Sequence, residues 1–479
     1  MRVLLVSTYE LGHQPLHVAA PAGGLRRHGH EVRGLDLAVD PLEPALVQWA
    51  EAVAISVPMH TAMRLARRAT AAVRALAPRV PVCFYGLYAG TDGGADDAGT
   101  PDLAITGEYL EPLASWVDAL AAGKAGGSPG TVRVELGRHP TGVPARGLLP
   151  PLERYAELVV AGARRPVGYV EASRGCAHRC RHCPVPVVYD GRTRLVGVED
   201  VLADVAQLVG MGARHLTYGD PDFLNGPHHA RRVVQAVHGA FPELTFDVTA
   251  KVTHVLAHGE LWPELAAAGC LFVVSAFESA TDSVLDRLDK GHRAADEAEA
   301  VRLLRGAGIE PRPSLLPFTP WTSPADVWDL LGLLERCDLV GNVDPVHYSI
   351  RLLVPPGSLL LDGGHLEGRL GVYDPELLGW QWRSSDPRLD VLQQGLALLA
   401  EEAGAGQWGA AAVHEAVRAA TGEVLGDTRP VVATDPDLRS PLPPDARPRL
   451  SEPWFCCAEP TTGQFESVAP EPALSPGAR

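Results

Sequence analysis

Residues 171–183 read EASRGCAHRCRHC, in which Cys176, Cys180 and Cys183 are separated by three and then two residues. Three thiolates on one tight loop can hold three irons of a 4Fe–4S cluster, which cysteines normally ligate. The fourth iron then has no protein ligand and stays open to a small molecule. A structural zinc site prefers four ligands, and no second cysteine pair lies nearby. His178 and His182 are the nearest further candidates for zinc ligands, but residues so close to the thiols in the chain cannot easily complete a tetrahedral coordination shell. The spacing therefore favours an iron–sulfur cluster.

The composition of the chain limits the classes of protein to which it can belong. A chain of 479 residues is long enough for two or three domains, and 46 % hydrophobic residues is ample for a sizeable core. The net charge of −16 lacks the basic footprint of a nucleic-acid-binding protein, so we expect no nucleic-acid partner. No run of about 18 apolar residues occurs, so we expect no membrane segment, and residues 1–7 are too short for a signal peptide. The eight cysteines do not form a disulfide pattern, which fits a reducing cytoplasm.

The first part of the chain, residues 1–125, alternates short apolar runs with amphipathic stretches. Apolar runs of this kind are typical of strands buried on both faces, which predicts a doubly wound, flavodoxin-like parallel sheet. The predicted strands are Val3–Ser7, Glu31–Leu37, Ala52–Val57, Val82–Tyr85 and Leu103–Ile105. Ligands of such sheets bind at the carboxyl ends of the strands. The residues at these ends are Ser7, His13, Ser56, His60 and Gly86.

The remaining chain divides into four further parts. Residues 126–165 are rich in Gly and Pro and are expected to form a linker. Residues 166–355 repeat a strand–helix alternation about six times, which predicts a partial (β/α)6 barrel with its site at the carboxyl ends of the strands. The last strand of this barrel is predicted over His347–Leu353. Residues 356–425 are expected to be mainly helical, and residues 426–479 form a Pro-rich, mostly irregular tail.

The cysteine loop follows the first barrel strand, and its Cys-x3-Cys-x2-Cys spacing resembles the radical S-adenosylmethionine (SAM) superfamily. The run Glu171–Cys176 resembles the cobalamin-domain branch of that superfamily. The resemblance implies that the open iron chelates the amino and carboxylate groups of SAM, and that electron transfer from the cluster cleaves a carbon–sulfur bond to give a carbon radical. It also implies a small-molecule substrate and a cellular reductant such as a flavodoxin or ferredoxin.

The resemblance extends to the segment Tyr218-Gly219-Asp220-Pro221-Asp222 at the end of the second barrel strand. In the family this position holds the SAM amino group, so we expect Asp220 or Asp222 to accept hydrogen bonds from that ammonium. The alternative is a simple turn before Asn225.

Other positions match the family in order. Ser275, Glu278 and Ser279 are expected close to SAM, although Ser279 is equally suited to begin a helix. Lys251 stands where relatives carry a basic residue near the SAM carboxylate or ribose. His182 is expected to pack against adenine. Arg192 and Arg194 follow the loop as in related sequences, and are equally suited to be solvated charges.

Whether cobalamin binds is left open by the sequence. The first 125 residues resemble the cobalamin-binding module of this branch by pattern and position. The Asp-x-His-x-x-Gly motif that supplies a cobalt ligand is absent, and the chain has Thr8-Tyr-Glu-Leu-Gly-His13 instead. Members of the branch are known both with and without the cofactor, and His13 or His60 is the candidate to approach a corrin.

The tail contains EPWFCCAEP at residues 452–460, with adjacent Cys456 and Cys457. This ending resembles the CUAEP/CCAEP-tail radical SAM proteins, in which the position of Cys456 can be selenocysteine. Because a Pro-rich tether leads to the aromatic pair Trp454-Phe455, which can anchor the segment, we expect a mobile dithiol that folds over the barrel mouth and takes part in the reaction. Reduced thiolates suit soft elements. The alternative is two incidental free thiols.

Three functions follow. The first is transfer of a SAM-derived carbon group to a small-molecule acceptor, such as a soft element held by the tail thiols. The second is cobalamin-dependent methyl transfer to a small molecule. The third is a non-catalytic metal or metalloid sensor.

Overall fold

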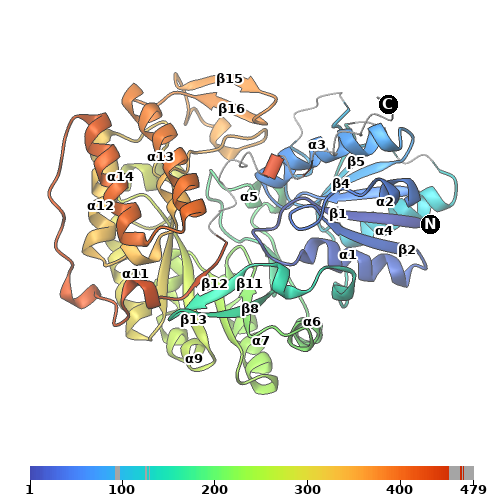
Figure 1. Cartoon of the computed structure of the whole chain (residues 1–479), viewed down its shortest axis with the longest axis horizontal. Coiled ribbons are helices and arrows are strands. Elements are labelled where there is room, and N and C mark those ends of the chain that lie inside the picture. The colour runs from blue at the N-terminus through green and yellow to red at the C-terminus, as the bar shows by residue number, and fades with distance from the viewer. Residues whose placement is uncertain (92–97, 125–126, 129, 453–463, 466–467, 469–479) are drawn as a thin grey trace, which may run out of the picture. The chain divides into compact units, whose positions relative to one another are not determined.

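A computed structural model describes residues 1–91, 98–124, 127–128, 130–452, 464–465 and 468 (Figure 1). The chain divides into two compact units. Unit 1 contains Met1–Arg154 and Pro375–Leu378 with the last part of the chain, and unit 2 contains Tyr155–Asp374 with the segment that starts at Gly379.

Unit 1 is built on a six-stranded, entirely parallel sheet in the order β2-β1-β3-β4-β5-β6. Every residue of β3 and β4 is buried, as expected for strands covered on both faces. The order 2-1-3-4-5 is the flavodoxin-like one, which confirms the predicted fold class. The strands are β1 (Arg2–Ser7), β2 (Glu31–Asp36), β3 (Ala52–Ser56), β4 (Val82–Tyr85), β5 (Leu103–Gly107) and β6 (Val132–Glu135).

Four helices accompany this sheet, and they pack in pairs, α1 with α4 and α2 with α3. Their bounds are α1 (Leu16–Arg27), α2 (Pro44–Trp49), α3 (His60–Leu76) and α4 (Leu110–Ala121). Strand β6 lies within the stretch predicted as a linker. It pairs with β5 from Ala104 to Gly107, so that part of the Gly/Pro-rich stretch extends the first sheet.

Unit 2 contains a seven-stranded sheet in the order β14-β13-β12-β11-β8-β7-β17. The five strands from β14 to β8 are parallel, whereas β7 pairs antiparallel with β8 and β17 pairs antiparallel with β7. This curled half-barrel agrees with the predicted barrel class. The strands are β7 (Glu157–Val160), β8 (Ala163–Val170), β11 (His215–Tyr218), β12 (Thr245–Thr249), β13 (Cys270–Glu278), β14 (Glu310–Leu315) and β17 (Arg449–Leu450).

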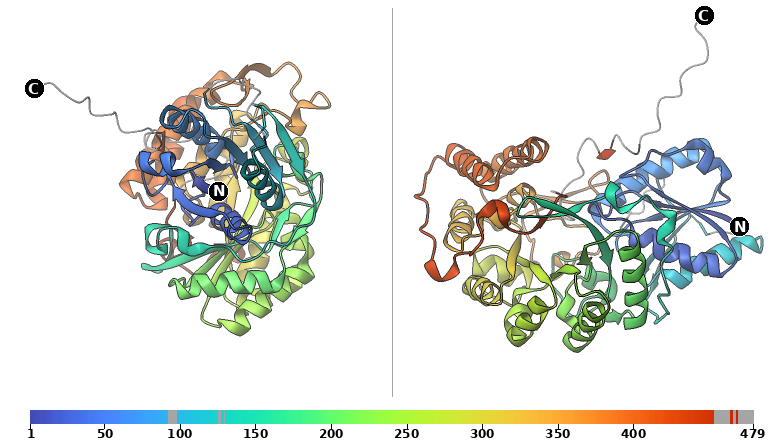
Figure 2. Two further views of the ribbon diagram at one scale, coloured as in Figure 1. Left: turned by 90° about the vertical axis from the view of Figure 1, so that its right-hand side faces the viewer. Right: turned by 60° about the horizontal axis from the view of Figure 1, so that its bottom comes forward.

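Helices lie along the outer side of this sheet, as the ribbon shows for α6, α7 and α9 (Figures 1 and 2). They carry a buried apolar stripe, for example Val201, Val205 and Leu208 on α6. The helices of the barrel are α6 (Val198–Gly210), α7 (Pro227–Ala240), α8 (Val252–Ala257), α9 (Trp262–Ala267), α10 (Asp282–Leu288), α11 (Ala294–Gly306) and α12 (Pro324–Arg336).

The sixth barrel strand, predicted over His347–Leu353, does not form. Residues Pro345–Tyr348 adopt a 3-10 helix, and one isolated parallel bridge between Phe318 and Arg351 follows. Pro345 stands at the first turn of that helix, where its fixed φ and missing N–H favour a helical start over a strand.

The region after the barrel contains the helices α13 (Pro387–Gly406) and α14 (Ala410–Leu425), which pack against each other, and the hairpin β15 (Leu370–Asp374) with β16 (Gly379–Trp382). Strand β17 comes from the segment predicted as an irregular tail and pairs with β7. The predicted catalytic residues Cys456 and Cys457 lie outside the described residues.

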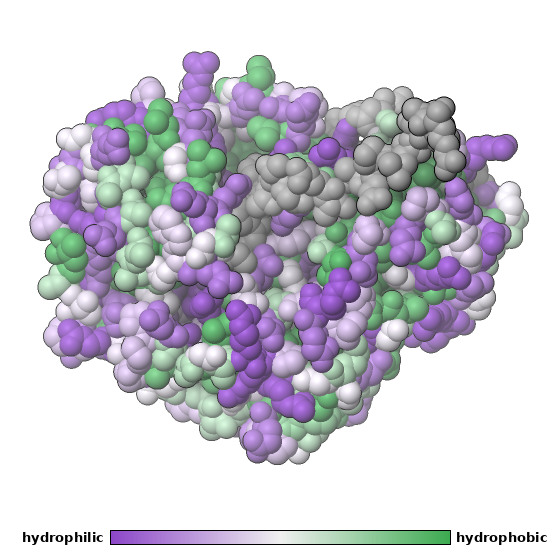
Figure 3. Space-filling model, viewed as in Figure 1, coloured by the Kyte–Doolittle hydropathy of each residue, from purple (hydrophilic) through white to green (hydrophobic). Residues whose placement is uncertain are grey.

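Hydrophilic and hydrophobic residues intermingle on the face in Figure 3. None of the helices among the described residues has the length and apolarity that crossing a bilayer requires.

Candidate active site

The cysteine loop is closed by a short hairpin. Strand β9 (Ser173–Gly175) leads into the loop and pairs antiparallel with β10 (Thr193–Leu195), and the short helix α5 (Val185–Tyr189) lies between them. Gly175 has φ +72°, and a Cβ atom there would come within 2.3 Å of the Arg192 carbonyl oxygen. Glycine is therefore required immediately before Cys176.

The three cysteine side chains lie close to the protein interior. Cys176 and Cys180 are buried and Cys183 is half-buried. The backbone N–H of Cys183 donates to the carbonyl of Cys180 at 3.1 Å, which makes the second half of the loop a tight turn. Burial raises the pKa of the Cys176 thiol, and the nearby Asp222 adds to this effect. A thiol in such a place ionises readily only with a positive charge or metal beside it.

Asp220 holds the start of the loop. Its Oδ2 accepts a hydrogen bond from the backbone N–H of Ala172 at 2.9 Å, and its Oδ1 accepts one from the Ser173 hydroxyl at 2.5 Å. Burial raises the pKa of Asp220 to about 7, against the effect of these two donors. Both oxygens have partners within the chain, so Asp220 positions the start of the cysteine loop, and its contact with SAM stays a prediction.

Asn225 and the carboxyl end of α10 hold the rest of the loop, the latter through Arg181 of the loop itself. The Oδ1 of Asn225 accepts the backbone N–H of Ala177 at 3.0 Å, and the Cys176 sulfur lies 3.7 Å from the same oxygen. The backbone N–H of Arg181 donates to the carbonyl of Leu288 at 2.9 Å. The Arg181 guanidinium donates to two further carbonyls at the carboxyl end of α10, at 3.1 and 3.0 Å. The loop is thus held by elements that lie far along the chain.

The three cysteine sulfurs do not form a compact group of ligand atoms around one point among the described residues. Among the described residues, His178, Asp222 and His254 form the one group whose three ligand atoms all lie within 4.8 Å of one another. The three cysteine sulfurs make no such group, although each is free of disulfide bonding. Thiolates that bind three different irons of one cluster must stand farther apart than ligands of one ion. The structure therefore supports the 4Fe–4S interpretation of the spacing over zinc.

A buried ion pair lies beside the loop. Strand β13 ends at Glu278, which has φ +67°, and there the pairing with β14 shifts register. Its Oε1 lies 3.0 Å from the ammonium of Lys290 and 3.4 Å from Nε2 of His182. Burial alone would raise the pKa of Glu278, but Lys290 and His182 hold it far below its usual range. Lys290 was missed by the sequence analysis, although it lies in the segment compared with the family.

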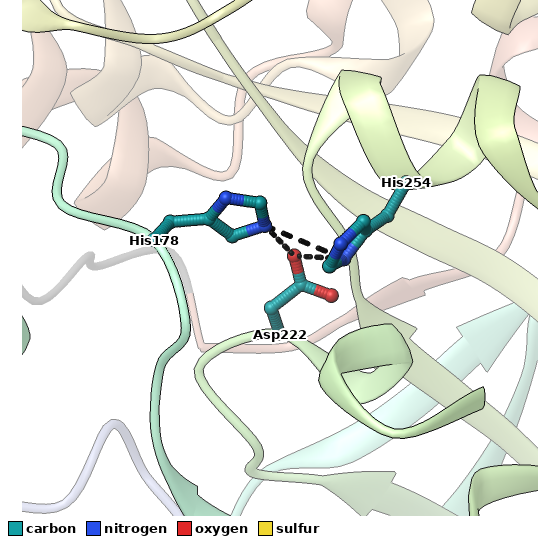
Figure 4. A group of neighbouring side chains, drawn as sticks. All are labelled: His178, Asp222 and His254. Carbon is teal, nitrogen blue, oxygen red and sulfur yellow. Dashed lines mark hydrogen bonds and ion pairs between the residues drawn. The ribbon is translucent and has the colours of Figure 1, made fainter. Parts of the chain in front are cut away.

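The carboxylate of Asp222 lies between two histidines (Figure 4). Its Oδ2 is 2.9 Å from Nδ1 of His254 and 3.5 Å from Nε2 of His178, and the two ring nitrogens are 3.5 Å apart. Burial would raise the pKa of Asp222, but the two histidines lower it below its usual value. The sequence predicted Asp222 as a site residue but not its partner His254, which comes from α8.

Lys251 lies at the amino end of α8 and is more than nine-tenths buried. Its backbone N–H donates to Oδ2 of Asp222 at 3.3 Å. No hydrogen bond or ion pair joins its ammonium to another described residue. An ammonium in this position is chemically suited to pair with an anionic ligand.

Several predicted residues have partners within the chain. The Ser275 hydroxyl donates to the carbonyl of Ala250 at 2.8 Å, and the Ser279 hydroxyl accepts the N–H of Thr281 at 3.3 Å. Tyr218 packs in the core between Phe223 and Phe246.

The remaining positions of unit 2 also have local roles. A Cβ atom at Gly219 would come within 1.9 Å of the Tyr169 hydroxyl, so the glycine makes room for that ring. Arg192 is exposed near Asp190, and Arg194 donates to the carbonyl of Thr193. His182 has a buried Nδ1 without a partner among the described residues.

In unit 1 the predicted positions lie at the carboxyl edge of the sheet and are buried. The Ser56 hydroxyl donates to Glu10, and His17 contacts the other oxygen of Glu10 at 2.9 Å. The Ser7 hydroxyl has no partner among the described residues. His60 Nε2 lies 2.7 Å from the Leu377 carbonyl oxygen, and burial lowers its pKa to about 4.

The other two positions of this edge, Gly86 and His13, are also internal. A Cβ atom at Gly86, which has φ +120°, would lie 2.8 Å from the Val57 carbonyl. His13 is buried in the turn after β1, where its backbone N–H donates to the carbonyl of Glu10.

Residues 170–334 match the family described as the Radical SAM superfamily, so the chain carries a radical SAM domain. Such a domain implies a 4Fe–4S cluster and SAM as cofactors, in agreement with the prediction from the cysteine spacing. The matched region contains the cysteine loop and the carboxyl ends of all five parallel strands.

Two solved structures share the wider fold. The cobalamin-dependent SAM radical enzyme OxsB with aqua-cobalamin superposes with a TM-score of 0.64 at 13 % identity, over 82 % of this chain and 66 % of OxsB. This chain thus corresponds to just under two thirds of that protein. The radical SAM methyltransferase TsrM from Kitasatospora setae, with tryptophan and a SAM analogue bound, gives 0.54 at 20 % identity, over 69 % and 70 % of the two chains. No curated protein sequence matches the chain.

Proposed function

We propose that the protein is a radical SAM enzyme that transfers a SAM-derived carbon group to a small-molecule acceptor. The observation that carries the proposal is the loop of Cys176, Cys180 and Cys183 within a radical SAM domain. When bound, a 4Fe–4S cluster supplies the electron that cleaves a carbon–sulfur bond of SAM. The chain's own residues hold the loop, bind the cosubstrate and exclude water.

Lys251 is the residue of this chain best suited to bind SAM. Its unpartnered ammonium offers charge-assisted hydrogen bonds to the carboxylate of SAM or to a ribose oxygen. Asp220 and Asp222 were expected to accept the SAM ammonium. Asp220 directs both oxygens to the loop, and Asp222 accepts from the backbone of Leu224 and Lys251 and lies 2.9 Å from His254. We therefore propose Lys251 as the contact of this chain with SAM that is most open to test.

We further propose that unit 1 binds cobalamin and that the transferred group is methyl. The fold likeness to OxsB, which covers most of the chain, supports this version. The buried Ser7 hydroxyl at the end of β1 offers an unused hydrogen bond to such a ligand. His60 is bonded to Leu377 and has a lowered pKa, so it is not available to the metal in this conformation. Binding without a histidine ligand is the expectation.

The test is anaerobic reconstitution of the full chain with iron and sulfide, with and without hydroxocobalamin, followed by chromatography of the products of SAM. Deoxyadenosine together with adenosylhomocysteine supports radical methylation. Methylthioadenosine supports transfer of the aminocarboxypropyl group instead. Cys180→Ala removes a cluster ligand and must abolish all cleavage of SAM. Cys83→Ala is the matched control, because Cys83 is a buried cysteine of unit 1.

The dithiol of the tail belongs to the aminocarboxypropyl version of the proposal. Cys456 and Cys457 would hold a soft acceptor, and a flavodoxin or ferredoxin would supply electrons. If serine at both positions leaves turnover of a true substrate unchanged, this role is wrong. Stoichiometric metalloid binding without cleavage of SAM would favour the sensor function.

A further inference from the structure

We propose that His178, Asp222 and His254 form a mononuclear site for a divalent transition-metal ion, separate from the cluster. The site goes beyond the proposed function and does not depend on it. The three side chains come from the cysteine loop, the turn after β11 and helix α8, and their ligand atoms converge on one point (Figure 4).

The distances between the ligand atoms are those of a coordination shell. Zinc binds histidine and carboxylate ligands at about 2.0–2.1 Å, which places neighbouring ligand atoms of a tetrahedron about 3.4 Å apart. The three separations here are 2.9, 3.5 and 3.5 Å. Hydrogen bonding explains the first of them, between His254 and Asp222. It does not explain the other two, because 3.5 Å is too long for a good hydrogen bond from an imidazole N–H.

The ligands are held in place before any metal binds. Oδ1 of Asp222 accepts the backbone N–H of Leu224 at 3.0 Å, and Oδ2 accepts that of Lys251 at 3.3 Å. These bonds fix the carboxylate between the two rings, as outer-shell partners commonly do for metal ligands. The Asp222 side chain is fully buried. The side chains of His178 and His254 are 23 and 18 % exposed, so an ion can enter from the histidine side.

The donor set identifies the class of ion. Two imidazole nitrogens and one carboxylate oxygen suit Zn²⁺ or Fe²⁺ better than Mg²⁺ or Ca²⁺, which prefer oxygen ligands. Three protein ligands leave at least one position open, as in catalytic zinc sites. His178 lies between Cys176 and Cys180 in the sequence, so this open position lies next to the cluster loop. A thiolate, carboxylate or alkoxide of a substrate is the chemistry that fits it.

The first test measures zinc and iron in the cluster-loaded full-length protein after equilibrium dialysis against buffered Zn²⁺, by plasma mass spectrometry. One zinc per chain in addition to the cluster iron is expected. His254→Gln should lower the zinc affinity at least tenfold while the iron content stays. His258→Gln is the matched control, because His258 lies one turn farther along and is not part of the group. Zinc binding that is equal in both variants, or absent in the parent, overturns the proposal.

The second test excludes zinc held by the loop thiols. The variant Cys176→Ala/Cys180→Ala/Cys183→Ala carries no cluster, and Co²⁺ then serves as an optical probe, with folding checked by circular dichroism. Visible d–d bands without a thiolate charge-transfer band are expected, and His254→Gln in this background should remove them. If the triple cysteine variant no longer binds cobalt although His254 is intact, the metal is held by sulfur and the proposed site is wrong. Neither test depends on SAM cleavage, so a failure of the metal-site proposal can be told apart from a failure of the proposed enzyme activity.

Discussion

The ammonium of Lys290 lies 3.0 Å from a carboxylate oxygen of Glu278, and both side chains are buried beside the cysteine loop. Only three lysines occur in the chain, Lys124, Lys251 and Lys290, and two of them are buried at this site. Arginine carries nearly all the other positive charge.

Lys290→Met is predicted to leave the charge of Glu278 buried without its partner and to lower the free energy of unfolding by about 3–5 kcal/mol. Chemical denaturation measures this difference. The double variant Lys290→Met/Glu278→Gln removes both charges and should recover much of the loss. A double variant as unstable as the single one would show that the pair does not act as a unit.

The same variant is predicted to make the cluster harder to reduce. A buried positive charge favours the more negative, reduced state of a cluster, and Cys180 and Cys183 contribute to the raised pKa of Lys290. Redox titration followed by electron paramagnetic resonance should show a lower potential for Lys290→Met than for Lys290→Arg. Equal potentials in the two variants would contradict an effect of the buried positive charge on the cluster.

Asp220→Asn is predicted to loosen the cysteine loop. The amide nitrogen can no longer accept from Ala172 or Ser173, which leaves a buried donor unsatisfied at a cost of about 1–3 kcal/mol. Iron content after reconstitution should fall, while the SAM affinity of the cluster-loaded fraction, measured by calorimetry, stays the same. A normal iron content with weakened SAM binding would instead support the original expectation of a direct SAM contact.

Gly175→Ala is predicted to disrupt the hairpin before Cys176. The added Cβ atom meets the Arg192 carbonyl at 2.3 Å, and the residue must also keep φ +72°. Together these effects cost at least about 1–3 kcal/mol, and iron loading should decrease. Gly210→Ala is the matched control, because nothing lies within 4 Å of a Cβ atom at the end of α6.

His347 is predicted to make unit 2 less stable in acid. Burial lowers its pKa to about 4 from an ordinary value near 6.5. The folded protein therefore keeps His347 neutral while the unfolded chain binds a proton, and stability is lost as the pH falls from about 6.5 towards 4. The loss is on the order of 3 kcal/mol. Thermal unfolding of the parent and of His347→Gln across this range checks it, and the variant should show the flatter curve.

The fold class could be predicted because its signals are local. The uninterrupted apolar runs of β3 and β4 indicate strands covered on both faces, and the cysteine spacing indicates the cluster loop. The prediction of a sixth barrel strand over His347–Leu353 was wrong. The apolar pattern after His347 favours a strand, but Pro345 starts a 3-10 helix there.

The partners within the site are not local, and this is why they escaped prediction. His254 reaches Asp222 across 32 positions of the chain, and Lys290 reaches Glu278 across a left-handed turn and a helix. Nothing in either residue's own neighbourhood marks it as part of the site. The bonds of Asp220 to the loop escaped prediction for a related reason, since its donors belong to β9 and the residue before it, in a different strand–helix unit.

The anchoring of Arg181 to the carboxyl end of α10 sets an order of events during synthesis. The cysteines leave the ribosome more than a hundred residues before Leu288, whose carbonyl fixes their loop. Until the first four parallel strands and α10 have been made and packed, the thiols have no fixed geometry to offer. Iron and sulfide delivered early would meet a loose peptide, so cluster insertion belongs after translation of most of the barrel.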